Sequence, residues 1–292
     1  MYVYLNSKIQ SDFDGYNHLI RLYHAAKASP EVEINFSFGN TWWFEANLSA
    51  VLGAIFEFLV DEGKKVVVSS IKPKIMDILK RNCFMGEFGE TIKSGSQNTT
   101  ISYKKFNPTA DDAFMNYIKT ELLSKPDFPK HSRLLGKKIN ESIFELYENA
   151  RTHGRCKQIH TCGQYYPNKT PKRLDITIVD MGKTIKANVN EFLNENLTGA
   201  EAIEWALEYG HTTKTGNISG GLGLDIIQEF IKLNNGKIQI ISSEGYWEFR
   251  RGETKKMLFD NFFPGTIANL EFNLDDQSIY QLKEEISLDD IF

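Results

Sequence analysis

The chain has 292 residues, of which 41% are hydrophobic and 25% charged, a composition typical of a folded globular protein rather than a disordered one. The formal net charge of -4 excludes a strongly basic nucleic-acid-binding protein, and three cysteines are too few for a disulfide framework. The first residues do not predict a signal peptide, and the longest apolar stretch, residues 48–60, is too short to cross a bilayer. We therefore expect a cytoplasmic protein that binds neither membrane nor nucleic acid.

The first half of the chain predicts alternating strands and helices. Residues 32–38 alternate apolar and polar side chains, as in a half-buried strand, and residues 46–61 carry apolar side chains at helical spacing. A buried strand is predicted over 65–69 and a second helix over 75–81. This order predicts βαβ units and a parallel sheet, which is an α/β architecture.

The segment 123–133 contains two prolines and no periodicity, and it predicts a linker. We therefore expect one domain over residues 1–122 and a second over 134–292. Within the first domain, the polar stretch 94–101 predicts a loop or a hairpin.

The second half predicts an α+β domain that begins with a long helix and continues with strands and shorter helices. The helices are expected at 134–152, 199–208 and 224–233, and the strands at 173–179, 236–242 and 265–274.

Two polar residues on the long helix form the first candidate site. Glu145 and Asn149 are four residues apart, so they project from the same side of the helix. A carboxylate can orient and deprotonate a hydroxyl group or water, and an amide oxygen is a suitable ligand for Mg²⁺. Such a pair is also common on the solvated face of a helix, so by itself it is not specific.

The strand over 173–179 leads into the second candidate site. Asp180 follows the apolar residues, and Gly182 permits a backbone turn that a side chain would block. A carboxylate in this place can accept a hydrogen bond from an amine of a ligand. An ordinary turn stabilised by the aspartate side chain is the alternative.

A glycine-rich run forms the third candidate site. Gly220, Gly221 and Gly223, with Leu222 between them, directly precede a predicted helix. Free backbone N–H groups at a helix N-terminus suit a phosphate group, and Lys214 would add a positive charge. A glycine-rich loop that binds no ligand is the alternative.

In their order and spacing, these motifs resemble the GHKL ATPase superfamily of gyrases, heat-shock chaperones, histidine kinases and mismatch-repair ATPases, over residues 134–274. Glu145-x-x-x-Asn149-Ala-x-x-His153-Gly looks like the N box, in the form seen in anti-sigma-factor serine kinases. Asp180-x-Gly182 looks like the first glycine box of that superfamily.

Two further motifs complete the resemblance. Gly220-Gly-Leu-Gly223 looks like the second glycine box, and residues 263–272 look like the last strand of the domain, with Thr266 at the adenine. Residues 183–219 then correspond to the mobile lid over the nucleotide. One departure is Thr184, where the first glycine box usually has glycine, and this puts the lid geometry in doubt.

The resemblance implies a Bergerat-type fold that binds ATP with Mg²⁺. It implies that Glu145 is the general base, Asn149 the Mg²⁺ ligand and Asp180 the adenine anchor. The remaining nucleotide contacts implied by it are Gly182, Lys214, Gly220, Gly221, Leu222, Gly223 and Thr266.

The glutamate in the N box bears on the reaction. Most histidine kinases of the superfamily have Asn at this position, and no helical hairpin with a phosphoacceptor histidine precedes the domain. Glu145 suits attack on ATP by water or by a Ser/Thr hydroxyl group of a protein. We expect an ATPase or a Ser/Thr protein kinase within a regulatory switch, and the alternative is a non-catalytic module whose protein binding is gated by the nucleotide.

The first half is similar to STAS domains, the fold of anti-sigma-factor antagonists. Ile34-Asn-Phe-Ser-Phe, the segment that starts with Trp42-Trp-Phe, and Lys65-Val-Val-Val follow the strand–loop–helix–strand order of that family. Ala46 stands where the family usually has a phosphorylated serine, so self-phosphorylation there is not expected. The resemblance implies a regulatory protein partner and leaves a homodimer open. The aromatic residues Trp42, Trp43 and Phe44 predict either an anchor for a partner or side chains that cap the domain's own core.

Overall fold

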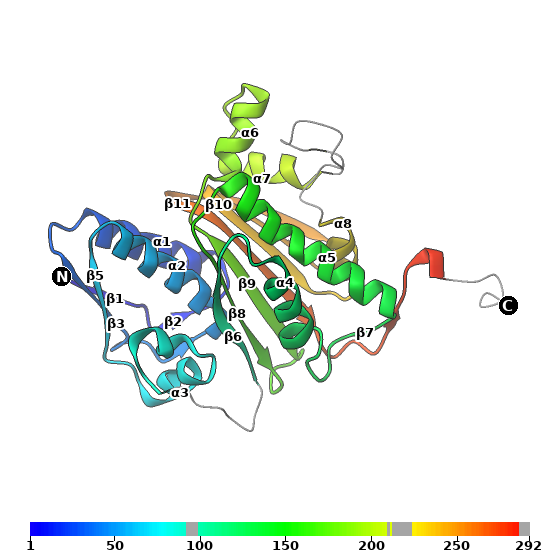
Figure 1. Ribbon diagram of the computed structural model, residues 1–292, viewed down its shortest axis with the longest axis horizontal. Coiled ribbons are helices and arrows are strands. Elements are labelled where there is room, and N and C mark those ends of the chain that lie inside the picture. The colour runs from blue at the N-terminus through cyan, green and yellow to red at the C-terminus, as the bar shows by residue number, and fades with distance from the viewer. Residues whose placement is uncertain (92–98, 209–210, 212–223, 286–292) are drawn as a thin grey trace.

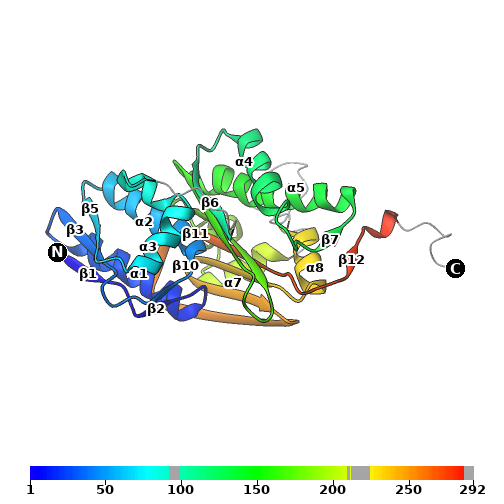
Figure 2. The same cartoon turned by 90° about the horizontal axis from the view of Figure 1, so that it is seen from below.

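The computed structural model describes residues 1–91, 99–208, 211 and 224–285. Two β-sheets and two sets of helices alternate in four layers, so the predicted mixture of helices and strands is confirmed (Figure 1, Figure 2). Among the described residues, no helix combines the length and the apolar character needed to cross a lipid bilayer.

The first sheet is parallel, as the sequence predicts. Its order is β1-β3-β5, with β1 at Tyr2–Tyr4, β3 at Glu33–Ser37 and β5 at Lys65–Ser69. Helices α1 (Phe13–Ala28) and α2 (Ser49–Asp61) cover one face of this sheet. The elements β3, α2 and β5 were predicted from the sequence, whereas β1 and α1 were not.

Shorter elements complete this part of the chain. Strands β2 and β4 pair with each other, and α3 follows β5 as predicted, although it begins two residues earlier. The bounds are β2 Lys8–Ile9, β4 Trp43–Phe44, a 3-10 helix Ala46–Leu48, α3 Pro73–Arg81 and a second 3-10 helix Phe84–Phe88.

The second sheet is antiparallel and has the order β10-β11-β9-β8-β6. The three predicted strands are present, but β10 continues beyond its predicted end and β11 begins before its predicted start, so that the two strands form a long hairpin. The strands β6 and β8 are additional to the prediction. The bounds are β6 Thr100–Phe106, β8 Ile159–Tyr166, β9 Arg173–Asp180, β10 Lys237–Arg250 and β11 Glu253–Asn273.

Residues before the predicted linker contribute to this second sheet. The strand β6 pairs with β8, and α4 (Asp111–Tyr117) packs against α5 (Arg133–Asn149). Within the predicted linker, β7 (Lys130–His131) pairs with β12 (Ile279–Tyr280) near the end of the chain. Most of the predicted loop at 94–101 lies outside the described residues.

Helices bury both faces of the second sheet. Helices α5 and α8 (Asp225–Leu233) cover one face, which we call the front face (Figure 2). Helices α1 and α2 cover the opposite face, which we call the back face. Along β9, Ile178 therefore packs on the front face and Val179 on the back face, because side chains of a strand alternate. Helices α6 (Ile185–Leu193) and α7 (Gly199–Leu207) lie at the end of this sheet beside β10.

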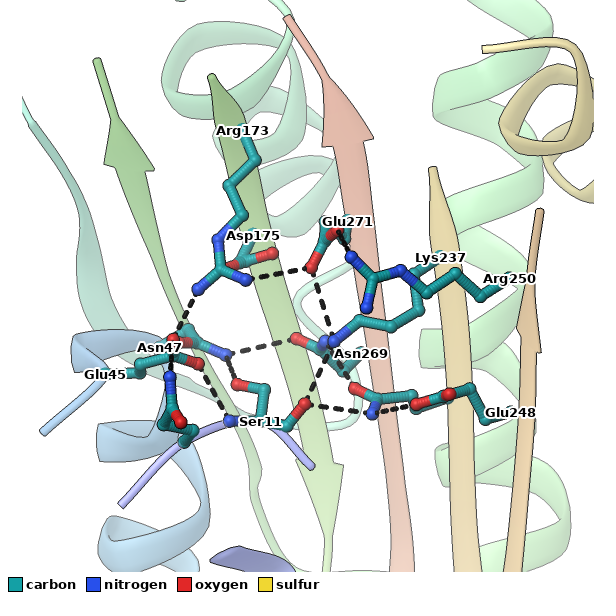
Figure 3. Close-up of polar contacts among 12 residues, drawn as sticks. Ser11, Glu45, Asn47, Arg173, Asp175, Lys237, Glu248, Arg250, Asn269 and Glu271 are labelled. Atoms are coloured by element: carbon teal, nitrogen blue, oxygen red, sulfur yellow. Dashed lines mark hydrogen bonds and ion pairs between the residues drawn. The ribbon is translucent and has the colours of Figure 1, made fainter. Parts of the chain in front are cut away.

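Charged and polar side chains lie between the back face of the sheet and the first part of the chain (Figure 3). Arg173 forms ion pairs with Glu45, with Asp175 at 3.4 Å and with Glu271 at 3.2 Å. Lys237 lies 3.3 Å from Glu271. Burial raises the pKa of Asp175 well above its ordinary range, and the nearby positive charge of Arg173 opposes this effect.

Hydrogen bonds extend this contact between the two layers. The side-chain amide of Asn47, before α2, donates to Ser11, to Thr177 on β9 and to Asn269 on β11, at 2.8 to 3.1 Å. All four residues are buried. Because buried polar groups need partners, this set of bonds favours one relative placement of the layers.

Candidate functional site

A cavity of about 760 Å³, open mouth included, lies at the C-terminal end of β9. Its walls come from α5, α6, α7 and the front face of the second sheet. Three of the predicted site residues line this one cavity, namely Asn149, Asp180 and Thr266. Much of the remaining wall is apolar, formed by Leu146, Ala150, Ile178, Ile185, Val189, Trp205, Ala206, Ile240 and Ala268.

Asp180 supplies a buried acid to this cavity. Its side chain is 5% exposed, and its Oδ1 atom has no hydrogen-bond partner among the residues that the structure describes. Burial raises the pKa of Asp180 to about 8, and a hydrogen bond from the backbone of Gly182 acts in the opposite direction. Asp180 therefore offers an incoming ligand a hydrogen-bonding group that the protein itself leaves unused.

Two glycines make room for the Asp180 carboxyl group. A Cβ atom on Gly182 would lie 2.2 Å from the carbonyl oxygen of Gly154, and one on Gly154 would lie 2.9 Å from Asp180 Oδ1. The amide of Lys183 donates to the same Gly154 carbonyl at 2.7 Å. Gly182 thus acts through close backbone packing, and it does not itself line the cavity.

Thr266 lies directly opposite Asp180 in the register of β9 and β11. Its Oγ1 atom is 3.2 Å from the Oγ atom of Ser242 on β10. That serine donates to the carbonyl of Gly265 at 2.8 Å and accepts a bond from the amide of Ile185 at 2.9 Å. The Ser242 hydroxyl therefore connects the threonine to the start of α6.

Asn149 is the last residue of α5, where the helix continues into a π-helical turn over Ala150–Gly154. Both Asn149 and His153 line the cavity. Glu145 is exposed one turn earlier on α5 and is not among the residues that line the cavity. The predicted pair therefore divides, with the amide at the cavity wall and the carboxylate outside it.

The remaining predicted contacts fall on another part of the chain. Lys214, Gly220, Gly221, Leu222 and Gly223 lie outside the described residues.

Thr184 has a structural role at the position where the sequence departs from the first glycine box. Its hydroxyl accepts the amide of Ala187 at 3.2 Å, which caps the N-terminus of α6. The α6 helix contributes Asn188 to the cavity. A threonine at this place is thus explained by helix capping.

Four polar or aromatic residues of the cavity are not among the site residues predicted from the sequence: Lys183, Asn188, Trp205 and His211. The rings of Trp205 and His211 stack, with centroids 4.6 Å apart and planes 22° apart. Asn188 donates to the carbonyl of His153 at 3.2 Å, which ties α6 to the end of α5. The apolar pattern of residues 199–208 indicated a buried helix but not that Trp205 would face a cavity.

The described residues contain no group of three or more His, Cys, Asp or Glu side chains that could hold a metal ion. Mg²⁺ differs from Zn²⁺ here, because it keeps several water and phosphate ligands and needs few from the protein. The amide of Asn149 on the cavity wall fits that limited requirement.

Comparisons with known proteins do not assign the chain to a family. No protein-family model matches it, and a search of curated proteins finds no significant match. The chemistry of the cavity is therefore the basis for a functional conclusion: apolar walls suit a flat ring, and one end carries a buried carboxyl group beside a hydroxyl.

Proposed function

We propose that the chain binds Mg-ATP as a member of the histidine kinase-like ATPase superfamily. In this proposal residues 134–274 form a Bergerat-type domain, and the first part of the chain is a STAS-like regulatory module. The observation that carries the proposal is that Asn149, Asp180 and Thr266, from three motifs far apart in the sequence, line one cavity.

The adenine ring would lie between the apolar walls with its amino group toward Asp180. The unused Oδ1 atom of this residue can accept a hydrogen bond from that amine. In a buried place, a hydrogen bond to a charged group contributes about 1.5 to 3 kcal/mol, which corresponds to roughly 10- to 150-fold in affinity. A guanine ring presents a carbonyl oxygen at this position, and this oxygen and the ionised carboxylate of Asp180 repel each other because both are acceptors.

The triphosphate would extend toward the N-terminus of α8, where the glycine run is expected to contact it. Asn149 would hold Mg²⁺, which neutralises charge on the phosphates. In the reaction, the bond from the γ-phosphorus to the β–γ bridging oxygen breaks to release ADP. A new bond forms to the oxygen of water or of a protein Ser/Thr, whose proton passes to Glu145.

One observation favours the alternative of a nucleotide-gated binding module without catalysis. Glu145 is exposed and lies outside the cavity lining, so the described arrangement places no acidic side chain of α5 against the cavity. In this alternative, ATP selects one conformation of the protein and a partner binds that conformation.

Titration calorimetry with ATP, GTP and ITP tests the binding proposal. Above pH 8, where the carboxyl group of Asp180 is mainly ionised, we expect ATP to bind with an affinity at least tenfold higher than the two 6-oxo nucleotides, because only the 6-amino group of adenine donates to Asp180. Phosphate release and label transfer from ATP, compared between wild type and Glu145→Ala, separate the enzyme from the gated module. Equal affinity for ATP and ITP would contradict the adenine assignment.

A further inference from the structure

The strand β5 is an edge of the first sheet, and no other described strand pairs with its outer side. The amide of Lys65 donates to the carbonyl of Val32, just before β3, at 2.8 Å. The carbonyl of Ser69 accepts from the amide of Phe38, just after β3, at 2.9 Å, so both groups point toward β3. Since the direction of backbone groups alternates along a strand, the N–H and C=O groups of Val66 and Val68 point away from β3. An open edge of this kind can accept a further strand.

An apolar groove lies beside this open edge. It has a free space of about 680 Å³, mouth included, between α2, the 3-10 helix Phe84–Phe88 and β6. Val66 of the edge strand is part of its wall, and Val60 near the end of α2 is 53% exposed there. The apolar members of the wall are Phe56, Val60, Val66, Phe84 and Phe88.

The groove and the edge fit together as parts of one binding surface. A strand that pairs with β5 would lie about 4.8 Å from it, and its side chains would alternate between the two faces of the sheet. Those on the helical face would lie next to the side chains of Val66 and Val68, which pack on the core below. One of these side chains would therefore enter the groove.

Charges near the edge define the chemistry of the added strand. Lys72 and Lys74, just beyond the end of β5, are exposed, and neither has an ion-pair partner within the described part of the chain. In the groove wall, Glu57 and Glu87 share the single cation of Lys105 at 3.3 and 2.5 Å, so the wall itself keeps one net negative charge. The uncompensated charge at the end of the edge is positive and suits acidic side chains.

We propose that β5 and the adjacent groove form a docking site for an extended peptide of a partner protein. The peptide adds a strand to β5, places one bulky apolar side chain in the groove and carries acidic residues near Lys72 and Lys74. The opposite edge, β1, is also open, but no groove among those described adjoins it, so the proposal applies to β5 alone.

The first experiment measures binding of a fluorescein-labelled peptide, acetyl-Val-Thr-Phe-Thr-Val-Thr-Asp-Asp-Glu-amide, to the full chain by fluorescence anisotropy. We expect saturable binding below 1 mM that weakens at least tenfold when Phe is replaced by Ala or the acidic residues by Lys. Affinity should also fall as salt rises from about 0.05 to 0.5 M, because the acidic contacts are exposed and therefore screened. Absence of saturable binding up to 1 mM would overturn the proposal.

Proline substitutions test the strand pairing. Val68→Pro removes an outward N–H without removing a bond to β3, and proline is tolerated on such an edge. We expect the affinity for the peptide to fall at least tenfold. Tyr4→Pro is the matched control, because it removes an outward N–H from the β1 edge, and it should leave the affinity unchanged.

A second pair of variants tests the groove independently of the strand. Val60→Glu places a negative charge at the groove, near the end of α2. The control is Leu233→Glu, which places a negative charge at the end of α8, where the side chain is 58% exposed and does not line the groove. Only Val60→Glu should weaken peptide binding by tenfold or more. If neither Val68→Pro nor Val60→Glu weakens binding while thermal unfolding shows folded proteins, the site is elsewhere and the proposal is wrong.

Discussion

Asp180 and Thr266 face each other on neighbouring antiparallel strands, and both line the same cavity. The carboxyl group is buried with one oxygen unused by the described protein, while the hydroxyl is in contact with Ser242. A carboxyl and a hydroxyl in adjacent positions can bind two neighbouring polar atoms on the edge of one flat ring. This relationship gives the nucleotide proposal a geometric basis that does not depend on the residues outside the described part of the chain.

Asp180→Asn should weaken ATP binding by roughly 10- to 100-fold, because the amide is neutral and a poorer acceptor for the adenine amine. Isothermal titration calorimetry measures the affinity, and circular dichroism shows whether the fold is retained. Asp14→Asn, an exposed substitution of the same kind on α1, on the other side of the second sheet, is the control and should bind ATP as wild type does. An unchanged dissociation constant for Asp180→Asn would remove the adenine anchor from the proposal.

Nucleotide affinity should rise with pH. The pKa of Asp180 is raised to about 8 in the folded protein, so the ionised acceptor becomes more abundant as the pH increases from 6 to 8. We expect an increase of up to about tenfold per pH unit, with a plateau above pH 8. Calorimetry in buffers of different ionisation enthalpy should detect proton release on binding at pH 7, and no proton release would argue against this acceptor.

The same pKa shift affects the stability of the unliganded protein. A carboxyl group with a pKa of 3.8 when unfolded and about 8 when folded stabilises the protein fully below pH 3.8, and this contribution is lost as the pH rises through 8. Asp180→Asn has no such titration. Between pH 6 and 8 its free energy of unfolding should therefore increase by about 1 to 3 kcal/mol relative to that of the wild type. Urea denaturation at several pH values measures the difference, and parallel pH curves would be the contrary result.

Gly182→Ala should destabilise the protein by about 1 to 3 kcal/mol and weaken nucleotide binding, because its Cβ atom would collide with the Gly154 carbonyl. Gly39→Ala is the control, since a Cβ atom there meets its nearest neighbours at 3.5 Å, an ordinary contact. Thermal unfolding with and without ATP measures both effects. Equal melting temperatures for the two variants would show that the backbone at 182 tolerates a side chain.

Arg173→Ala should be strongly destabilising, by about 3 to 5 kcal/mol, because it leaves Glu45 and Asp175 buried without their shared cation, whereas Glu271 keeps Lys237. Arg133→Ala, on the exposed side of α5, is the control and should change the free energy of unfolding little. The loss in Arg173→Ala should be greater at pH 8 than at pH 5.5, since protonated carboxyl groups tolerate burial better. Urea denaturation at both pH values measures it, and a loss independent of pH would indicate lost packing instead.

Local patterns in the sequence predict the elements that have a regular apolar period. The parallel strands β3 and β5, the helices α2 and α5, and the last part of β11 follow from such patterns. Strands β6 and β8 were not predicted. Strand β8 contains glycine, polar and aromatic residues whose fit depends on partners elsewhere in the sheet, and such pairing has no signal within one strand.

The candidate site could be predicted in part for the same reason. Asn149 and Asp180 are the last residues of α5 and β9, and Thr266 lies within β11 directly opposite Asp180. Trp205 and His211 contact the cavity through the packing of α7 against the sheet, which no local pattern specifies. Glu145 lies outside the cavity lining because one helical turn separates it from Asn149. The spacing of the two residues shows that they share a side of the helix, but not which of them reaches the cavity.

The pairing of β6 with β8 has a consequence for synthesis on the ribosome. Residues 100–106 leave the exit tunnel well before their partner at 159–166. Strand β6 therefore has no partner strand until some fifty further residues have been synthesised. For the same reason, a fragment ending at residue 122 would carry an unmatched strand and would tend to aggregate. Expression of separate halves should therefore divide the gene upstream of residue 100.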